Sequence, residues 1–371
     1  MIRLKFIWRT AVLSAVFLTM ALSVGVWESD AQAVDFSGER ITVIVPFSEG
    51  GGTDVYARFL VPLLREHLPG KPTMLIRNIP GAGSIAGANQ FQERAKPDGL
   101  TVMGVSTSTI TNYALKDPRA KYRLDTWNPI ILSPLGAVVY GRAEIGVKLG
   151  DSPKTIVEKL KAYRLVYGGQ SITSGDIRPN ISLAMLGIKP KTVWGLKGRG
   201  PPRLAFERGE FNINYDTAQA YTKRVVPMIE AGKATPLFSF GFVDDDGNMI
   251  RDPLFPDLPH FAEVYEGYWG KKPSGPDWKA WFAFFNMGTM ASKSLHLPAG
   301  TPQDIIDTYR KAAVDMMASA EYKKAATKVV GEYPQALGKQ AKRIILDAAT
   351  IPPDAKAWLD KWLKEEHNTE L

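Results

Sequence analysis

The sequence predicts an α/β protein with two doubly wound, Rossmann-like domains. Short apolar runs alternate with longer segments of helical periodicity almost throughout residues 41–349. Loops rich in glycine and hydroxyl side chains follow several of the apolar runs, as they do at the carboxyl ends of strands in open α/β sheets. The chain of 371 residues is also long enough for two domains.

The first predicted unit is a strand, a glycine-rich loop and a helix. Residues 41–46 are apolar and β-branched, residues 47–54 contain three glycines, and a helix is expected near Val55 with Thr53 or Asp54 as its N-cap. A helix N-terminus presents unpaired N–H groups and favours negative charge. No Lys-Ser/Thr pair follows the glycines, so the loop is not a nucleotide P-loop. The pattern predicts a pocket for a small anion such as a carboxylate.

The later elements continue the alternation. Strands are predicted at 73–76, 100–105, 165–167, 191–194, 211–215 and 236–240, and a further apolar run lies at 130–139. Helices are predicted at 84–95, 153–162, 177–186, 202–208, 218–229, 301–316, 321–330 and 339–349. Ser152 and Thr301 each precede a proline and are expected to cap their helices.

Three segments have competing interpretations. Gly81–Ala86 matches the dinucleotide fingerprint, but it follows the second predicted strand rather than the first, which favours a plain glycine-rich loop. Asp244–Gly247 lacks the flanking residues of a calcium loop and is expected to be a solvated turn. The aromatic residues between 265 and 285 are expected to pack in the core or between domains, and lining a ligand cleft is the alternative for one or two of them.

Residues 1–33 are predicted to be a signal peptide. Three basic residues precede an uncharged apolar stretch from Thr10 to Val26, and Ala31-Gln32-Ala33 fits a cleavage site. An uncleaved N-terminal anchor is the alternative. Cleavage would start the mature chain near Val34 and place it in the periplasm.

Composition argues against several functions. The chain has no cysteine, which excludes disulfides, thiolate metal sites and cysteine nucleophiles. Its four histidines lack metal-ligand spacing and no serine stands in a nucleophile elbow, so no metal site, cofactor or catalytic residue is predicted and an enzyme is not expected. The net charge is +8, or +7 without residues 1–33, and the basic residues are scattered. Nucleic-acid binding is therefore not predicted.

Four motifs connect the chain with a known family. They are Val45-Pro46-Phe47 with Gly50-Gly51-Gly52-Thr53-Asp54 and Ala57-Arg58, Asn78-Ile79-Pro80-Gly81-Ala82-Gly83, Lys96-Pro97-Asp98-Gly99, and Leu297-Pro298-Ala299-Gly300-Thr301-Pro302. In this order they resemble the extracytoplasmic solute-binding proteins of tripartite tricarboxylate transporters, the TctC or Bug family. The resemblance covers most of the chain after residue 33. It implies a type II-like periplasmic-binding-protein architecture, in which two α/β domains joined by a hinge close on a ligand. Residues 34–137 with 241–371 are expected to form domain I, and residues 138–240 domain II.

The resemblance also implies the ligand and the partner. A small organic carboxylate would be held by amides and hydroxyls of the first loop, with help from second-domain loops, and delivered by a monomeric protein to the permease of a tripartite tricarboxylate transporter. A ligand-sensing subunit of a membrane signalling system is the alternative, and an exported hydrolase is a more distant one. The expected ligand-binding residues are Phe47, Ser48, Glu49, Gly50, Gly51, Gly52, Thr53, Asp54, Gly83, Ser84, Ser106, Thr107, Gln170, Ser171, Thr173, Ser174, Lys197 and Asp216.

Glu49 departs from the family pattern, which has a small residue at this place. Its carboxylate either turns outward or lies at the mouth of the pocket. At the mouth it would repel highly charged ligands and favour monocarboxylates or ligands with an amine.

Overall fold

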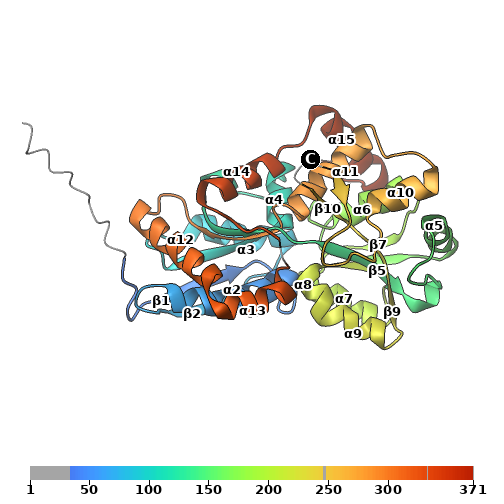
Figure 1. Ribbon diagram of the computed structural model, residues 1–371. Coiled ribbons are helices and arrows are strands. Elements are labelled where there is room, and N and C mark those ends of the chain that lie inside the picture. Colours follow the sequence, from blue (N-terminus) through green and yellow to red (C-terminus); the bar gives the residue numbers. More distant parts are fainter. Residues whose placement is uncertain (1–33, 245–247, 332, 371) are drawn as a thin grey trace, which may run out of the picture. The chain divides into compact units, whose positions relative to one another are not determined.

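The computed structural model describes residues 34–370 except 245–247 and 332. The predicted signal peptide, residues 1–33, lies outside the described residues. Val34 onward forms one compact unit with two main β-sheets, each flanked by helices (Figure 1). The predicted α/β class is confirmed. Among the described residues, no helix is both long enough and apolar enough to cross a membrane.

The first sheet has six strands in the order β13-β4-β12-β3-β1-β2. The strands are β1 (Arg40–Val45), β2 (Thr73–Asn78), β3 (Thr101–Ser106), β4 (Asn128–Ser133), β12 (Lys293–Leu297) and β13 (Ala336–Leu337). Strand β1 is parallel to β2 and β3, whereas β12 runs antiparallel to both β3 and β4, so the sheet is mixed. The helices that accompany it are α2 (Gly52–His67), α3 (Ile85–Arg94), α4 (Thr107–Ala114), α12 (Gln303–Ala318), α13 (Ala320–Val329) and α14 (Gly338–Ala348). We call these elements the first lobe.

The second sheet has five strands in the order β7-β6-β8-β5-β9. The strands are β5 (Ala137–Arg142), β6 (Val166–Gly168), β7 (Lys191–Val193), β8 (Ile213–Thr217) and β9 (Ala234–Ser239). Strand β6 is parallel to β7 and β8, and β5 is antiparallel to β8 and β9. Its helices are α5 (Pro153–Ala162), α6 (Ile177–Met185), α7 (Gly200–Glu207), α8 (Ala218–Ala220) and α9 (Val226–Glu230), with a π-helical turn, η4 (Tyr221–Val225), before α9. We call these elements the second lobe.

Short 3-10 turns and a small hairpin complete the connections. The 3-10 turns are η1 (Ala82–Ser84), η2 (Leu124–Thr126) and η3 (Ala143–Ile145), and the hairpin consists of β10 (Phe242–Val243) and β11 (Met249–Ile250). Most of the predicted Asp244–Gly247 turn lies outside the described residues.

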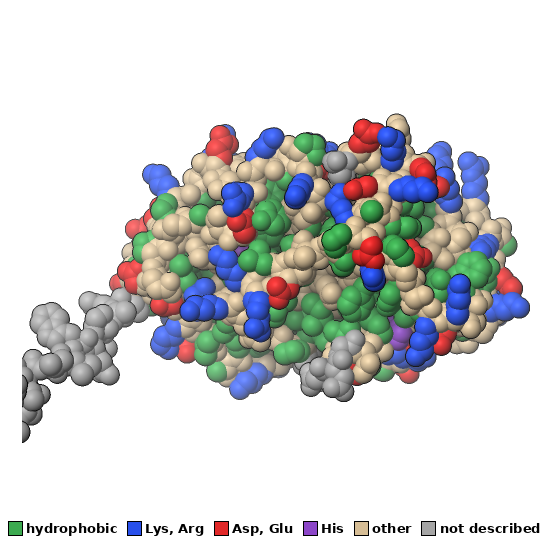
Figure 2. Space-filling view, turned by 90° about the horizontal axis from the view of Figure 1, so that it is seen from above, with side chains coloured by type: hydrophobic (Ala, Val, Ile, Leu, Met, Phe, Trp, Pro, Cys, Tyr) green, Lys and Arg blue, Asp and Glu red, His purple; other side chains and the backbone are tan. Residues whose placement is uncertain are grey.

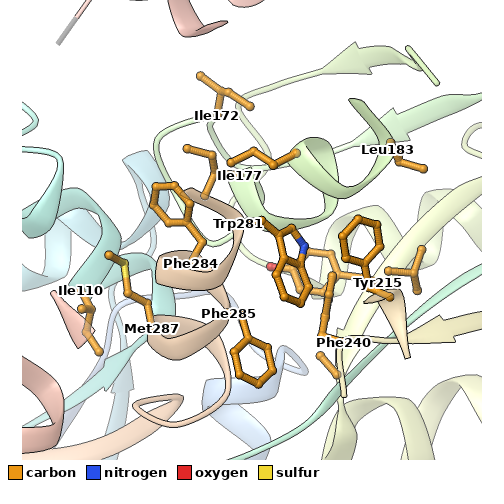
Figure 3. Close-up of a cluster of buried hydrophobic side chains, with 14 of the residues drawn as sticks. Ile110, Ile172, Ile177, Leu183, Tyr215, Phe240, Trp281, Phe284, Phe285 and Met287 are labelled. Atoms are coloured by element: carbon orange, nitrogen blue, oxygen red, sulfur yellow. The ribbon is translucent and has the colours of Figure 1, made fainter. Parts of the chain in front are cut away.

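Three further helices are rich in aromatic residues. They are α10 (Phe261–Trp269), α11 (Pro276–Gly288) and α15 (Pro353–His367). Helix α10 packs on α5, and α11 packs on both α6 and α15. Figure 3 shows Trp281 and Phe284 of α11 beside Ile177 of α6. Tyr265, Trp281, Phe284 and Phe285 therefore pack in the core, largely against the second lobe, whereas Trp269 is 45% exposed. The predicted domain boundaries stay a prediction.

The apolar run at 130–139 contains parts of two strands, β4 and β5, which belong to different sheets and are separated at Pro134, a residue that cannot donate to a strand ladder. Two local predictions are wrong. The N-cap of α2 is Gly51, and Thr53 and Asp54 lie inside the first turn. Thr301 does not cap α12, since the N-cap is Pro302. The predicted cap of α5 is confirmed, because Ser152 Oγ accepts a hydrogen bond from Thr155 N at 3.2 Å.

Charged side chains are mixed over the visible surface. On the face in Figure 2, Lys and Arg side chains stand among Asp and Glu side chains over most of the surface. Exposed charges arranged in this way are screened by water and salt. Buried charges, which water does not screen in this way, interact more strongly with a ligand.

Candidate functional site

A small cavity lies between the two lobes, at the ends of β1, β3 and β8 and the beginning of β12. Its volume is about 30 Å³, which is room for about two water molecules. The residues that line it are Phe47, Gly51, Gly52, Thr53, Ser106, Thr107, Ser108, Gln170, Arg178, Arg199, Tyr215, Thr217 and Lys293. Nearly all of them are polar or are glycines, so the lining is suited to a polar ligand.

Strand register explains why these residues meet. Strands β1 and β3 are parallel, so their carboxyl ends lie at one edge of the first sheet. Strand β12 runs the opposite way and begins at that edge, where Lys293 is paired with Ser106 on one side and Ser133 on the other. In the second sheet, β8 ends at Thr217. The cavity thus lies where open α/β sheets bind their ligands.

The loop after β1 brings the N-terminus of α2 to the cavity. Gly51 is the N-cap and no side chain caps the helix, so its first N–H groups face the cavity region without a side-chain acceptor. The Asp54 carboxylate accepts hydrogen bonds from Gly50 N at 2.9 Å, Arg58 Nε at 2.9 Å and Asn78 Nδ2 at 3.0 Å. Asp54 therefore fixes the shape of the loop, and the helix end is left to favour an anion.

The second lobe contributes a buried ion pair. The Asp176 carboxylate accepts from Arg199 Nη1 at 2.7 Å, from Gln170 N at 2.9 Å and from Ser174 Oγ at 2.8 Å. Arg199 also donates to the backbone oxygen of Tyr215. Burial acts to lower the pKa of Arg199, but the neighbouring Tyr167 and Asp176 outweigh it and raise the pKa. Arg199 is therefore a neutralised structural cation at the cavity wall.

Two other cations at the cavity are buried without an acidic partner. Arg178 is 1% exposed, donates from Nη1 to Thr289 Oγ1 at 3.1 Å, and lies over the Phe240 ring at 3.8 Å. Lys293 is 4% exposed and donates to the backbone oxygen of Ser292 at 3.2 Å. Neither forms an ion pair with any residue in the described part of the chain. Burial lowers the pKa of Arg178 to about 10, and burial with the charge of Arg178 lowers the pKa of Lys293 to about 7.

A larger hollow lies on the outer side of the first loop. Its volume is about 740 Å³, and its lining includes Glu49, Arg58 and Lys223. The side chains of Glu49 and Arg58 are 78% and 48% exposed and pair at 3.6 Å. Water screens such surface charges, so the small cavity is the stronger candidate for a ligand site.

Comparison with known proteins places the chain in a family. A UPF0065 protein of Bordetella pertussis is 30% identical over 287 residues, which are 75% of this chain and 76% of that protein. The chain belongs to the UPF0065 (Bug) family. No family model matches this UPF0065 protein.

Solved structures share the fold of this UPF0065 protein. The periplasmic binding protein BugD has a TM-score of 0.64 with 20% identity, over 90% of this chain and 99% of BugD. An R. palustris protein solved with adipate has a TM-score of 0.65 with 19% identity, over 88% of this chain and 97% of that chain. The predicted periplasmic-binding-protein architecture is confirmed.

The structure brings part of the predicted site together at the cavity. The predicted residues that line it are Phe47, Gly51, Gly52, Thr53, Ser106, Thr107 and Gln170. Glu49 turns outward, the first of its two predicted orientations, and Lys197 is exposed. Neither side chain reaches the cavity.

The other predicted residues of this UPF0065 protein support the loops. Ser48 N and Oγ donate to Lys197 O at 2.9 and 2.7 Å, which ties the first lobe to the second. Thr173 donates to Asp117 at 3.0 Å, and Asp216 pairs with Arg203. The predicted residues outside the cavity lining are Ser48, Glu49, Gly50, Asp54, Gly83, Ser84, Ser171, Thr173, Ser174, Lys197 and Asp216. As ligand contacts, they stay a prediction.

Sequence reasoning missed Arg178, Arg199 and Lys293. Arg178 is the only charged residue in α6, and a single charge in an otherwise uncharged helix could have pointed to a functional residue. Lys293 begins β12, whose sequence Lys-Ser-Leu-His-Leu lacks the apolar run that predicts a buried strand. Only the tertiary structure shows that both cations reach one cavity.

A substitution at Gly52 tests how tightly the two lobes pack against each other. A Cβ at Gly52 would lie 2.2 Å from Thr217 Oγ1, and the branched Thr217 side chain has little freedom to move away. We expect Gly52→Ala to lower the free energy of unfolding by about 1–3 kcal/mol, because overpacking strains the interface. Gly51→Ala is the control, since its Cβ would meet its nearest atoms at 3.6 Å. Equal thermal stability of the two variants would contradict this account.

Proposed function

We propose that this protein is a periplasmic solute-binding protein that captures a small organic carboxylate and delivers it to the permease of a tripartite tricarboxylate transporter. One observation carries the proposal. The N-terminus of α2 and two buried cations without acidic partners in the described chain converge on one cavity. A helix N-terminus and an unpaired buried cation both favour a bound anion.

Capture by this site requires no bond to be made or broken. The cavity of about 30 Å³ is far smaller than a ligand site of ~300 Å³ or more, so the lobes separate to admit the ligand. The contacts that open include Ser48 with Lys197 and Arg203 Nη2 with Gly50 O, which are 2.7–2.9 Å apart. On closure, fixed backbone dipoles and cations replace the water around the carboxylate.

Family membership supports the proposal. BugD is a periplasmic binding protein, and the R. palustris neighbour holds adipate, a carboxylate. The predicted leader at residues 1–33 agrees with export to the periplasm, and N-terminal sequencing of the periplasmic fraction tests its cleavage near Val34. Delivery is tested by ligand uptake in cells that lack this chain, because the uptake should return only when the chain is restored.

A thermal-unfolding screen tests the ligand class. The panel contains mono-, di-, tri- and aromatic carboxylates, with the neutral amide of each as its size-matched control. A carboxylate at 100 times its Kd is expected to stabilise the folded protein by about 2.7 kcal/mol, and its amide by much less. Stabilisation by the amides alone, or by no compound of the panel, would overturn the proposal.

A further inference from the structure

The charges around the cavity do not balance. The described residues include four buried basic side chains of Arg or Lys, namely Arg178, Arg199, Arg203 and Lys293. Arg199 and Arg203 pair with the buried carboxylates of Asp176 and Asp216 at 2.7 and 2.9 Å. Arg178 and Lys293 form no ion pair with any described residue, so no carboxylate there offsets the positive charge that either side chain carries.

The two unpaired cations come from different lobes. Arg178 lies on α6 of the second lobe, and Lys293 begins β12 of the first lobe. They are close enough that the charge of Arg178 lowers the pKa of Lys293. Because the two cations repel each other, an anion between them would relieve the repulsion and hold the lobes together.

Arg178 is fixed in place by its surroundings. Its guanidinium lies over the Phe240 ring, and a Cβ at Gly288 would lie 2.4 Å from Nη1. Its Nε has no hydrogen-bond partner in the described chain, and neither has Gln170 Oε1 or Thr217 Oγ1 at the same cavity. Buried polar atoms are normally satisfied, so the unpaired donor of Arg178 points to a missing acceptor.

We propose that Arg178 and Lys293 set the charge of the ligand, in that each neutralises one carboxylate of a small dicarboxylate that bridges the lobes. The inference rests on the proposed function and goes beyond it. The site discriminates against the same molecule with a single charge, because one buried cation would then stay unpaired. Glu49 has no part in this selection, since its carboxylate faces solvent.

Calorimetric titration with matched ligand pairs tests the proposal. The probes are succinate, glutarate and adipate, each compared with its monoamide, which has similar size but one charge fewer. The wild-type protein is expected to bind at least one of the dianions about 100-fold more tightly than its monoamide. Lys293→Met and Arg178→Met are each expected to reduce this ratio to less than about 5-fold. Lys191→Met, which changes an exposed lysine of β7, is expected to keep it.

The outcomes distinguish failure of the charge-selection proposal from failure of the proposed function. Equal affinity of the wild-type protein for a dianion and its monoamide would overturn the charge selection and leave carboxylate binding standing. Binding of none of the probes, together with failure of the wider carboxylate screen, would overturn the proposed function. Binding of inorganic phosphate or sulfate in place of every dicarboxylate would also overturn the charge-pair assignment. The wild-type ratio needs no variant, so the test survives if Arg178→Met fails to fold.

The uptake of a proton on ligand binding gives a second measurement of the role of Lys293. The titratable or charged groups that share the cavity with it are Arg178, Arg199 and Tyr215. Arg178 and Arg199 stay charged at pH 8, and burial raises the pKa of Tyr215, so Tyr215 stays neutral. Lys293, whose pKa is lowered to about 7, gains a proton when a dianion binds. Titrations at pH 8 in buffers of different ionisation enthalpy should show uptake of nearly one proton by the wild-type protein and none by Lys293→Met. Absence of uptake in the wild type would overturn the role of Lys293.

Discussion

Replacing Asp176 by asparagine is expected to lower the free energy of unfolding by about 3–5 kcal/mol. Asp176 is fully buried, and its carboxylate accepts from Arg199 Nη1 at 2.7 Å and from Gln170 N at 2.9 Å. The neutral amide removes the negative charge and leaves the Arg199 guanidinium uncompensated in the interior. Urea unfolding followed by circular dichroism measures the loss.

Two further variants separate the buried pair from a general effect of losing a carboxylate. Asp315→Asn removes one member of the Lys311–Asp315 pair on α12, whose side chains are 73% and 43% exposed, and should cost less than about 0.5 kcal/mol. Combining Asp176→Asn with Arg199→Met removes both buried charges and should recover part of the loss. If Asp176→Asn cost no more than Asp315→Asn, the buried pair would not contribute as described.

Replacing Lys293 by methionine is expected to stabilise the unliganded protein at pH 7 by roughly 3–5 kcal/mol. Burial, with the charge of Arg178, lowers the pKa of Lys293 from 10.5 to about 7, so the folded protein disfavours the charged side chain. Methionine has a similar length and no charge. The site thus holds a cation that costs stability, as binding sites often do.

The pH dependence of this effect has a definite sign. Between about pH 7 and 10.5, the unfolded chain binds a proton at Lys293 that the folded protein does not bind, so the wild type gains stability as the pH rises. The advantage of Lys293→Met is therefore full below about pH 7 and shrinks toward pH 10.5. Thermal unfolding from pH 6 to pH 9.5 follows this change, and Lys191→Met should match the wild type throughout. An advantage that stayed constant over this range would contradict the assignment.

Local sequence was enough to predict most of the fold, because each buried strand needs a short apolar run and each turn needs its own residues. Strand β12 shows where this reasoning ends. Lys293, Ser294 and His296 are polar, yet all are at most 4% exposed in the middle of the first sheet. Their burial depends on β3 and β4, which lie on either side of β12 in the sheet but are too far away in the sequence for a local pattern to include. The assignment of β4 and β5 to different sheets depends in the same way on tertiary pairing, which a local sequence pattern does not show.

The candidate site was likewise predicted only in part, namely where its residues are close in sequence. The glycines and hydroxyls of residues 47–54 and 106–107 were predicted, because a strand end, a tight loop and a helix start are close in sequence. The cations were not, because Arg178 and Lys293 come from different lobes and meet only on folding. Lys197 was also predicted as a ligand contact, but its side chain is exposed.

The position of β12 also sets the order in which the chain can fold. This strand pairs with both β3 and β4, so the centre of the first sheet stays open until Leu297 has been synthesised. Until then, two apolar strand edges lack their partner and are prone to wrong pairing. Contacts between such distant parts of the chain form slowly. We therefore expect the first sheet to close late in synthesis, after all the strands of the second sheet, which end at Ser239, have been made.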